Sequence, residues 1–142
     1  MSTPTTSPTN PSKALVIALW ITQVLVFAFF VAVGAVKLFT PMSQLASMMP
    51  WPGQYPEAFV RTIGIIDIAG GLGILLPSLT RIKPGLTVLA ALCCAVLQIF
   101  AAVFHIYRGE ASLTPTNFVL LALCAFVLWG RRYKASILPR QS

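Results

Sequence analysis

Residues 61–77, RTIGIIDIAGGLGILLP, form an apolar stretch that carries a single carboxylate, Asp67. An ionised aspartate at the centre of a membrane helix costs about 3 kcal/mol on insertion scales, so such a residue usually has a partner or a role. The glycines around Asp67 would weaken a helix in water, but in lipid small residues let a neighbouring backbone approach closely. Asp67 is therefore the residue around which we expect fold and function to be organised.

The composition indicates one small membrane domain. The chain has 142 residues, of which 57% are hydrophobic and 9% are charged, and its mean hydropathy is +0.84. Such a chain is too apolar to be a water-soluble domain of this size. The net charge of +7 comes from Lys and Arg residues that lie between apolar runs and near the C-terminus. They do not form one basic face, so we expect the lipid bilayer, and no nucleic acid, as a partner.

Four apolar runs predict an all-α integral membrane four-helix bundle. The predicted spans cover about residues 14–36, 58–76, 85–106 and 117–130. The first span exceeds the apolar core of a secretory signal, so we expect it to be retained. Pro77 is predicted to end the second span. The domain is predicted over 14–132, between a flexible Ser/Thr/Pro-rich tail at 1–13 and a basic tail at 133–142.

The connection between the first two spans, residues 38–57, has its own pattern. Thr40 and Pro41 are typical of an N-cap followed by a first-turn proline, and they predict a short Met-rich helix that Pro50 closes. Trp51 follows with a tyrosine among prolines, which suits the headgroup region better than bulk water. The connection either covers the bundle as a lid or forms a plain interfacial loop, and the sequence leaves both open.

Basic residues near the spans predict the orientation, because cytoplasmic loops carry an excess of them. Seven fall on the side of both termini, namely Lys13, Arg81, Lys83, Arg131, Arg132, Lys134 and Arg140. Three fall on the other side, namely Lys37, Arg61 and Arg108. Both termini are therefore expected to face the cytoplasm.

Antiparallel spans would gather polar side chains at the outer end of the bundle. These side chains are Lys37, Arg61, Asp67, His105 and Asn117. Helical spacing places each of three sets on one helix face. The sets are Gln23, Phe27, Phe30, Gly34 and Lys37; Cys94, Gln98, Ala101 and His105; and Gly64, Asp67 and Gly71.

The partner of Asp67 can be narrowed by geometry. Arg61 lies six residues earlier, about 240° around the helix and about 9 Å along it. Glu57 lies four residues before Arg61, in the favourable acid-first order, so these two are expected to pair unless Arg61 faces headgroups. Asp67 then needs Lys37 or His105 from a neighbouring helix, since a lone carboxylate in a low dielectric would take up a proton.

Two readings of this polar group follow. In the first, Asp67 and His105 exchange protons or hydrogen bonds with a ligand in an outward-opening pocket. In the second, Asp67, Lys37 and His105 only join three helices, each interaction contributing about 1 kcal/mol. Arg108, Glu110 and Asn117 are expected mainly to order a turn and to cap the fourth helix, with ligand contact as the alternative.

Several chemistries do not fit the sequence. One histidine cannot supply paired axial haem ligands, and no His/Cys/Asp cluster has the spacing of a metal site. Cys93 and Cys94 are adjacent and Cys124 lies on another span, so no Cys-x-x-Cys pair exists. We expect these thiols to be inert packing residues. No glycine-rich nucleotide loop and no nucleophile with an adjacent base is present.

The motifs, taken together, resemble the DoxX-like family of small four-span bacterial membrane proteins. They are Gly34-Ala-Val-Lys37-Leu38, Arg61-x-x-Gly64-x-x-Asp67-x-x-Gly70-Gly71-x-Gly73-x-x-x-Pro77, His105-x-x-Arg108-Gly109-Glu110, Asn117 and Gly130-Arg131. The resemblance covers about residues 14–132. The family usually has Glu where this chain has Asp67, and the shorter arm reaches about one bond less far, which puts any contact needing that reach in doubt.

The resemblance implies a location in the bacterial inner membrane and a function linked to redox chemistry. Some relatives are described as membrane subunits linked to sulfur oxidation with quinone reduction, or as partners in oxidative-stress complexes. For this chain it implies an outer-half pocket for a small amphipathic ligand, with a quinone as the candidate cofactor and a partner protein that supplies electrons. Asp67 and His105 would donate protons, and Lys37 would balance charge. The further ligand-binding candidates are Arg61, Gln98, Arg108 and Asn117.

A different class of function fits the same residues. The chain would then be a non-enzymatic ligand or lipid carrier, or an assembly scaffold whose polar cluster only fixes helix packing. Whether a reaction is catalysed, and whether the chain forms a homo-oligomer, is left open by the sequence.

Overall fold

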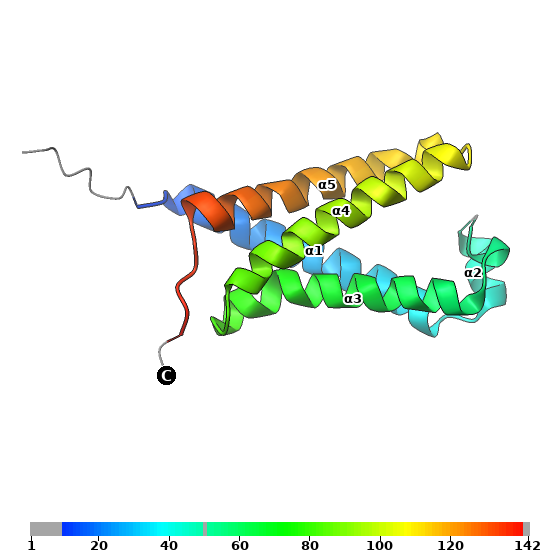
Figure 1. The fold of residues 1–142 in the computed structure, drawn as a ribbon, viewed down its shortest axis with the longest axis horizontal. Helices are drawn as coiled ribbons and strands as arrows, with labels where there is room; N and C mark the ends of the chain where they lie inside the picture. The colour runs from blue at the N-terminus through cyan, green and yellow to red at the C-terminus, as the bar shows by residue number, and fades with distance from the viewer. Residues whose placement is uncertain (1–9, 50, 141–142) are drawn as a thin grey trace, which may run out of the picture.

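The computed structural model describes residues 10–49 and 51–140, and these residues form helices joined by short connections (Figure 1). The long helices are α1 (Lys13–Phe39), α3 (Glu57–Thr80), α4 (Gly85–Tyr107) and α5 (Thr114–Trp129). The short elements are α2 (Met42–Met48), the 3-10 turns η1 (Pro52–Gln54) and η2 (Ala111–Leu113), and the π-helical turn η3 (Gly130–Lys134). No strand occurs in the described part of the chain.

The predicted four-span architecture is confirmed. Within the described residues, four helical segments are long and apolar enough to cross a membrane, namely Lys13–Phe39, Glu57–Thr80, Gly85–Tyr107 and Ala111–Lys134. The protein is therefore an all-helical, multi-pass membrane protein. Residues 1–9 of the predicted flexible tail lie outside the described residues.

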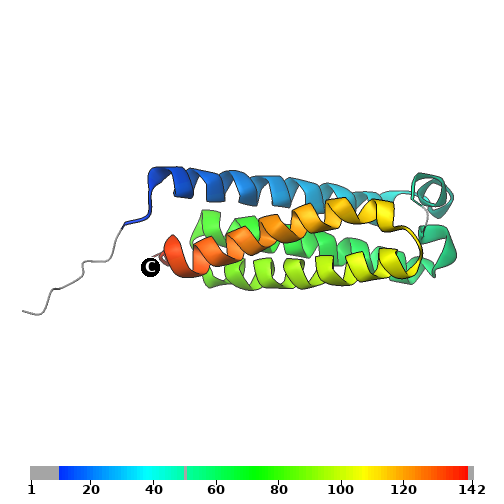
Figure 2. The ribbon, with the colours of Figure 1, turned by 90° about the horizontal axis from the view of Figure 1, so that it is seen from above.

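The four long helices form two pairs that diverge toward one end. α1 packs on α3, and α4 packs on α5. The pairs meet at the end that carries the α3–α4 turn and the start of α1, and they separate toward the end that carries α2 (Figure 1). Figure 2 shows the helices running side by side, with α2 beyond one end of the bundle and the start of α1 at the other. The end with the α3–α4 turn is called the closed end below, and the end with α2 is called the open end.

Thr40 does not have the predicted role. α1 runs on to Phe39, and Thr40 is its C-cap, whose backbone N–H donates to the carbonyl of Val36 over 3.1 Å. Its extended conformation, with ψ at 136°, is what a residue before proline prefers. Pro41 then takes the N-cap position of α2 without any side-chain hydrogen bond. Pro50, predicted to close this short helix, lies outside the described residues.

Pro77 does not end the second span. α3 continues through Pro77 to Thr80, and Arg81 closes it in the left-handed conformation with φ at 58°. Proline removes one backbone hydrogen bond, and membrane helices tolerate this loss where neighbouring groups compensate. Ser78, directly after Pro77, lies 2.7 Å from the hydroxyl of Thr87 on α4 and accepts a bond from Gln23 on α1 over 3.0 Å. These contacts hold the last turn of α3 in the bundle.

The fourth span begins earlier than predicted. α5 starts at Thr114, with Pro115 in its first turn, a position where the missing N–H of proline costs nothing. Asn117 lies inside the helix, so the prediction that it caps this helix is wrong.

Glycines let α1 and α3 touch, as predicted for Gly64 and Gly71. A Cβ atom on Gly64 would lie 2.8 Å from the carbonyl oxygen of Gly34, and one on Gly71 would lie 3.2 Å from the carbonyl oxygen of Phe27. A Cβ contact below 3.0 Å does not fit, so any side chain at Gly64 would push α1 and α3 apart.

The core lies where the two pairs meet. Its buried members are Val26, Phe30, Ile74, Ala91, Cys94, Ala95, Leu120, Cys124 and Val127. Cys94 and Cys124 are packing residues, as predicted. Cys93 is exposed, so the expectation that it is a packing residue is wrong. Adjacent residues point about 100° apart on a helix, so Cys93 points away from the core that Cys94 joins.

Candidate functional site

The carboxylate of Asp67 forms an ion pair with Lys37. Lys37 Nζ donates to Asp67 Oδ2 over 2.8 Å, and the two side chains are only 13% and 6% exposed. Lys37 lies in the last turn of α1, one turn beyond Gly34, and Asp67 lies one turn beyond Gly64 on α3. Because these glycines bring the helices together, the Asp67 side chain reaches Lys37 although it is shorter than a glutamate side chain. Of the two predicted partners, Lys37 is confirmed.

Arg61 has a supporting role beside this pair. It bonds to Glu57 Oε1 over 3.0 Å, as predicted, and its Nη1 donates to the carbonyls of Lys37 and Thr40 over 2.8 and 2.6 Å. The last carbonyls of a helix have no partner within it, and Arg61 supplies one for the C-terminus of α1. It therefore holds the turn of α1 that carries Lys37.

His105 does not contact Asp67 and pairs with Glu110 instead. His105 Nδ1 lies 3.0 Å from Glu110 Oε2, and Arg108 donates to Glu110 Oε1 from Nη2 over 2.9 Å. Arg108 Nη1 also donates to Gln54 Oε1 over 2.7 Å, which ties the α4–α5 turn to η1. The bonds from Arg108 and then from His105 hold the pKa of Glu110 below its ordinary value. Glu110 is thus an anion at neutral pH.

The contact with Glu110 decides what His105 can do. An ionised carboxylate accepts only, so Nδ1 carries the hydrogen, and Nε2 is an acceptor in the neutral ring and a donor in the protonated ring. Among the described residues, Nε2 has no hydrogen-bond partner. His105 can therefore present either an acceptor or a donor on the side away from Glu110.

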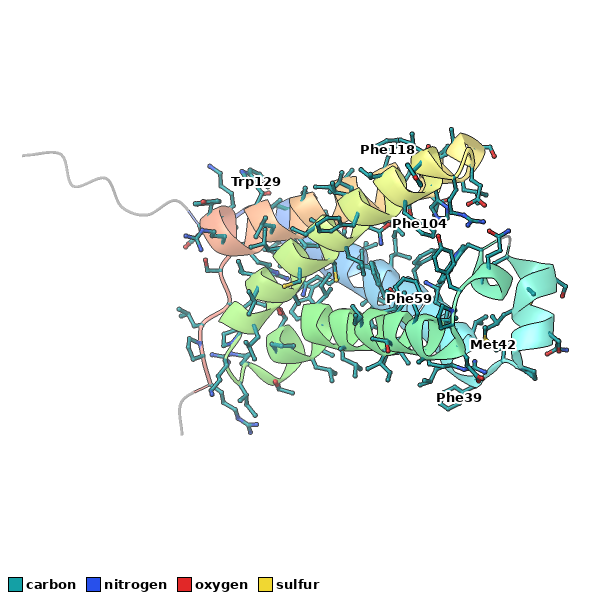
Figure 3. The ribbon with its side chains drawn as sticks, turned by 45° about the vertical axis from the view of Figure 1, so that its right-hand side comes forward. Phe39, Met42, Phe59, Phe104, Phe118 and Trp129 are labelled. Carbon is teal, nitrogen blue, oxygen red and sulfur yellow. The ribbon has the colours of Figure 1, made fainter. Side chains whose placement is uncertain are left out.

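A cavity of about 550 Å³ lies between the two helix pairs toward the open end. Its polar lining residues are Lys37 and Asp67 from the α1–α3 pair, and Gln98, His105 and Asn117 from the α4–α5 pair. Aromatic side chains form much of the remaining wall, including Phe29, Phe30, Phe59, Phe100 and Phe104. Figure 3 shows Phe59 of α3 and Phe104 of α4 at the open end between the pairs. Arg61 and Arg108 lie outside this lining.

The described part of the connection over residues 38–57 covers the open end. Trp51 is 8% exposed, and its ring centroid lies 6.2 Å from that of Phe59 and 5.9 Å from that of Phe104. Lys37 Nζ lies 5.8 Å from the same ring, a favourable cation–π distance. Trp51 lines the cavity, so the described part of this connection packs on the bundle as a lid rather than as a loose interfacial loop.

Two polar atoms of the cavity residues lack partners. Gln98 Oε1 and Asn117 Nδ2 are buried and have no hydrogen bond within the described residues. A buried polar group without a partner costs about 1–3 kcal/mol. Both residues line the same cavity from neighbouring helices, so the two unpartnered atoms belong to residues of one cavity wall.

The comparison with known proteins agrees with this architecture. The model of the DoxX-like family matches residues 21–127. The chain belongs to the DoxX-like family. The matched range contains all the polar residues of this DoxX-like cavity, from Lys37 to Asn117. No curated protein and no solved structure matches the chain.

Two residues of the site were not predicted from the sequence. The sequence predicts Trp51 in the headgroup region, and it predicts that Glu110 orders a turn, with ligand contact as the alternative. It predicts neither the packing of Trp51 on the cavity nor the bond between Glu110 and His105. A signal for Glu110 exists, because it follows His105 by five residues across the end of α4, where a chain that turns back brings the two together. Trp51 had no such signal, since its position depends on how the whole connection folds over the bundle.

Proposed function

We propose that this DoxX-like protein binds a small amphipathic ring compound in the cavity between the two helix pairs, with a quinone as the favoured class. The observation that carries the proposal is the combination of aromatic walls with a few polar groups from both pairs. Small-molecule sites of about 300–1,000 Å³ bury an apolar body in this way and fix its orientation with few polar contacts.

The unpartnered amides support a ligand that carries ring oxygens. Asn117 Nδ2 is a donor that fits a carbonyl oxygen, and Gln98 Oε1 is an acceptor that fits a hydroxyl. A quinone offers carbonyl oxygens, which fit Asn117, and a quinol offers hydroxyl groups, which fit Gln98. Each form thus has a complementary residue on the α4–α5 pair.

Exposed apolar side chains at the rim support entry from the bilayer. Phe100 and Val103 on α4 and Phe59 on α3 line the cavity and are also exposed. In a membrane these side chains face lipid, so an apolar tail can extend between them while the ring lies inside. We place the cavity in the outer half of the bacterial inner membrane, because the basic excess at the closed end favours cytoplasmic termini.

We assign different proton roles to the α4–α5 wall of the cavity, which carries His105, and to the α1–α3 wall, which carries Lys37 and Asp67. A bound quinone supplies an acceptor for two electrons and two protons. His105 would supply one proton from Nε2, because Glu110 retains the hydrogen at Nδ1, and the ε-ammonium of Lys37 at the other wall would supply the second. Both groups would regain their protons from the aqueous side, and Asp67 would position Lys37. The two electrons would come from a redox partner protein, for which this chain would be the membrane subunit.

One observation favours the alternative, a carrier or an assembly scaffold without catalysis. The Lys37–Asp67 pair joins α1 to α3 and can stabilise the bundle whether or not a ligand binds. Under this alternative, neither a redox partner nor proton transfer is required.

The proposal is tested by measuring the binding of decylubiquinone to the full chain in nanodiscs. Quenching of tryptophan fluorescence is the readout. Asn117→Leu should weaken binding about tenfold, the effect of one lost hydrogen bond to a polar ligand group, without lowering thermal stability. Thr116→Leu, an exposed neighbour on the same helix, is the matched control and should bind like wild type. Absence of quenching in the wild type, or equal binding by both variants, would contradict the proposal.

A further inference from the structure

The closed end of the bundle has a strong charge imbalance. The chain has only three side-chain carboxylates, Glu57, Asp67 and Glu110, and all of them bond to cations outside the closed end. The closed end instead gathers basic side chains from the α3–α4 turn and from the end of α5. No acidic side chain is available there to pair with them.

One of these cations is buried. Arg131 is 5% exposed, and all its contacts are neutral. Its Nε donates to Gln23 Oε1 over 2.7 Å, its Nη1 donates to the carbonyl of Ala135 over 3.0 Å, and its guanidinium carbon lies 4.9 Å from the ring centroid of Trp20. Its Nη2 is buried and has no hydrogen-bond partner among the described residues. A buried charge without a counter-charge is costly. An anion beside this guanidinium would offset that cost.

A cavity of about 260 Å³ lies beside this guanidinium. Arg131, Arg132, Ser78 and Ser136 line it together with Gly85 at the start of α4. Arg131 and Ser78 are linked through Gln23, whose Nε2 donates to Ser78 Oγ over 3.0 Å. The cavity is distinct from the aromatic cavity, which lies toward the open end.

The start of α4 adds to the positive potential in this cavity. Pro84 occupies the N-cap position, and no side chain caps this 23-residue helix. Helix N-termini carry unpaired backbone N–H groups and the positive end of the helix dipole, which favour phosphate and other anions. The N–H groups of Leu86 and Thr87 already donate to the carbonyls of Lys83 and Pro84, and Ser136 donates to the carbonyl of Arg132, so the α4 N-terminus contributes mainly its dipole. Arg131 and Arg132 supply the charged donors, and no carboxylate among the described residues opposes them.

We propose that this closed-end cavity binds a phosphate group, carried either by an anionic phospholipid or by free phosphate. The cavity lies at the ends of the membrane-spanning helices, where lipid headgroups lie, and its groups provide charged and hydroxyl donors of the kind that recognise phosphate. The inference is independent of the aromatic cavity and of any quinone chemistry. It assigns to Arg131 a role in ligand recognition in addition to helix packing.

The test compares the full chain in three settings: phosphatidylcholine nanodiscs, the same nanodiscs with inorganic phosphate in the buffer, and nanodiscs that contain phosphatidylglycerol. Thermal unfolding and native mass spectrometry of retained lipid are the readouts. Stabilisation with retained phosphatidylglycerol identifies a lipid headgroup, and stabilisation by inorganic phosphate identifies free phosphate. If neither addition raises the unfolding temperature, the proposal is overturned.

Variants keep the test specific. Arg132→Gln removes a lining cation, whereas Lys134→Gln removes the same charge outside the lining. We expect Arg132→Gln to weaken phosphate-group binding about tenfold more than Lys134→Gln, as for one lost charged hydrogen bond. Arg131→Met should abolish the difference in unfolding temperature between the neutral and anionic settings, whatever its effect on basal stability. Equal effects of Arg132→Gln and Lys134→Gln, or a difference retained in Arg131→Met, would overturn the proposal.

Discussion

A Cβ atom on Gly34 would lie 2.6 Å from the carbonyl oxygen of Gly64. α1 and α3 therefore touch backbone to backbone one turn before the Lys37–Asp67 ion pair. The close approach and the ion pair are consecutive features of one helix interface, and the first makes the second possible for a side chain as short as Asp.

Gly34→Ala should lower the free energy of unfolding by about 1–3 kcal/mol, because an added methyl group overpacks a tight interface. Thermal unfolding in detergent measures this loss. Gly85→Ala is the matched control, since a Cβ at Gly85 meets nothing within 4 Å and should leave stability nearly unchanged. Equal stability of the two variants would show that the contact does not constrain the bundle.

Removing one member of the Lys37–Asp67 pair should destabilise the protein by about 3 kcal/mol or more, because the remaining charge is left buried. Asp67→Asn and Lys37→Met are the single variants. In the double variant no buried charge remains, so its loss should be smaller than the sum of the two. Strictly additive losses in chemical unfolding would contradict a direct interaction.

Acid should weaken the α4–α5 turn through Glu110. Bonds from Arg108 and His105 lower the pKa of Glu110 in the folded protein, so the stability it contributes is complete above the pKa of the unfolded chain and is lost as the pH falls through the folded value. The unfolding temperature should therefore fall from neutral pH into the acid range. Glu110→Gln should be less stable than wild type at neutral pH and show a flatter pH profile; a parallel profile would contradict this assignment.

Gln23 joins three helices and should be sensitive to substitution. Its Nε2 donates to the carbonyl of Ile74 over 2.8 Å, and its Oε1 accepts from Arg131. Gln23→Leu leaves the buried Nε of Arg131 without a partner, which should cost about 1–3 kcal/mol of unfolding free energy. Gln44→Leu changes an exposed glutamine of α2 and should be nearly neutral in the same thermal assay.

The sequence was sufficient for the spans, and it narrowed the partner of Asp67 to Lys37 or His105. Span length follows from bilayer thickness, so four apolar runs predicted four helices. Helical periodicity put Lys37 on one face with Gly34 and Asp67 on one face with Gly64, but it did not choose between the two partners. Each of these inferences depends on spacing along a single helix.

The remaining features depend on contacts between distant segments. α3 continues past Pro77, and Gln23 and Thr87 hold Ser78, the residue directly after it. No local pattern predicts these partners. His105 faces Glu110 rather than Asp67 because the two helix pairs diverge toward the open end. That divergence is set by packing along the whole length of both pairs, so the aromatic cavity and the lid position of Trp51 could not be read from periodicity.

The divergence of the pairs has a mechanical consequence. Hydrogen bonds between the pairs concentrate at the closed end, where Gln23, Ser78, Thr87 and Arg131 are linked. At about 1.5 Å per residue, α4 extends roughly 30 Å beyond Thr87, so a tilt of about 4° around that fixed end shifts Tyr107 by about 2 Å. Small rotations at the closed end would therefore change the separation of the two helix pairs at the open end.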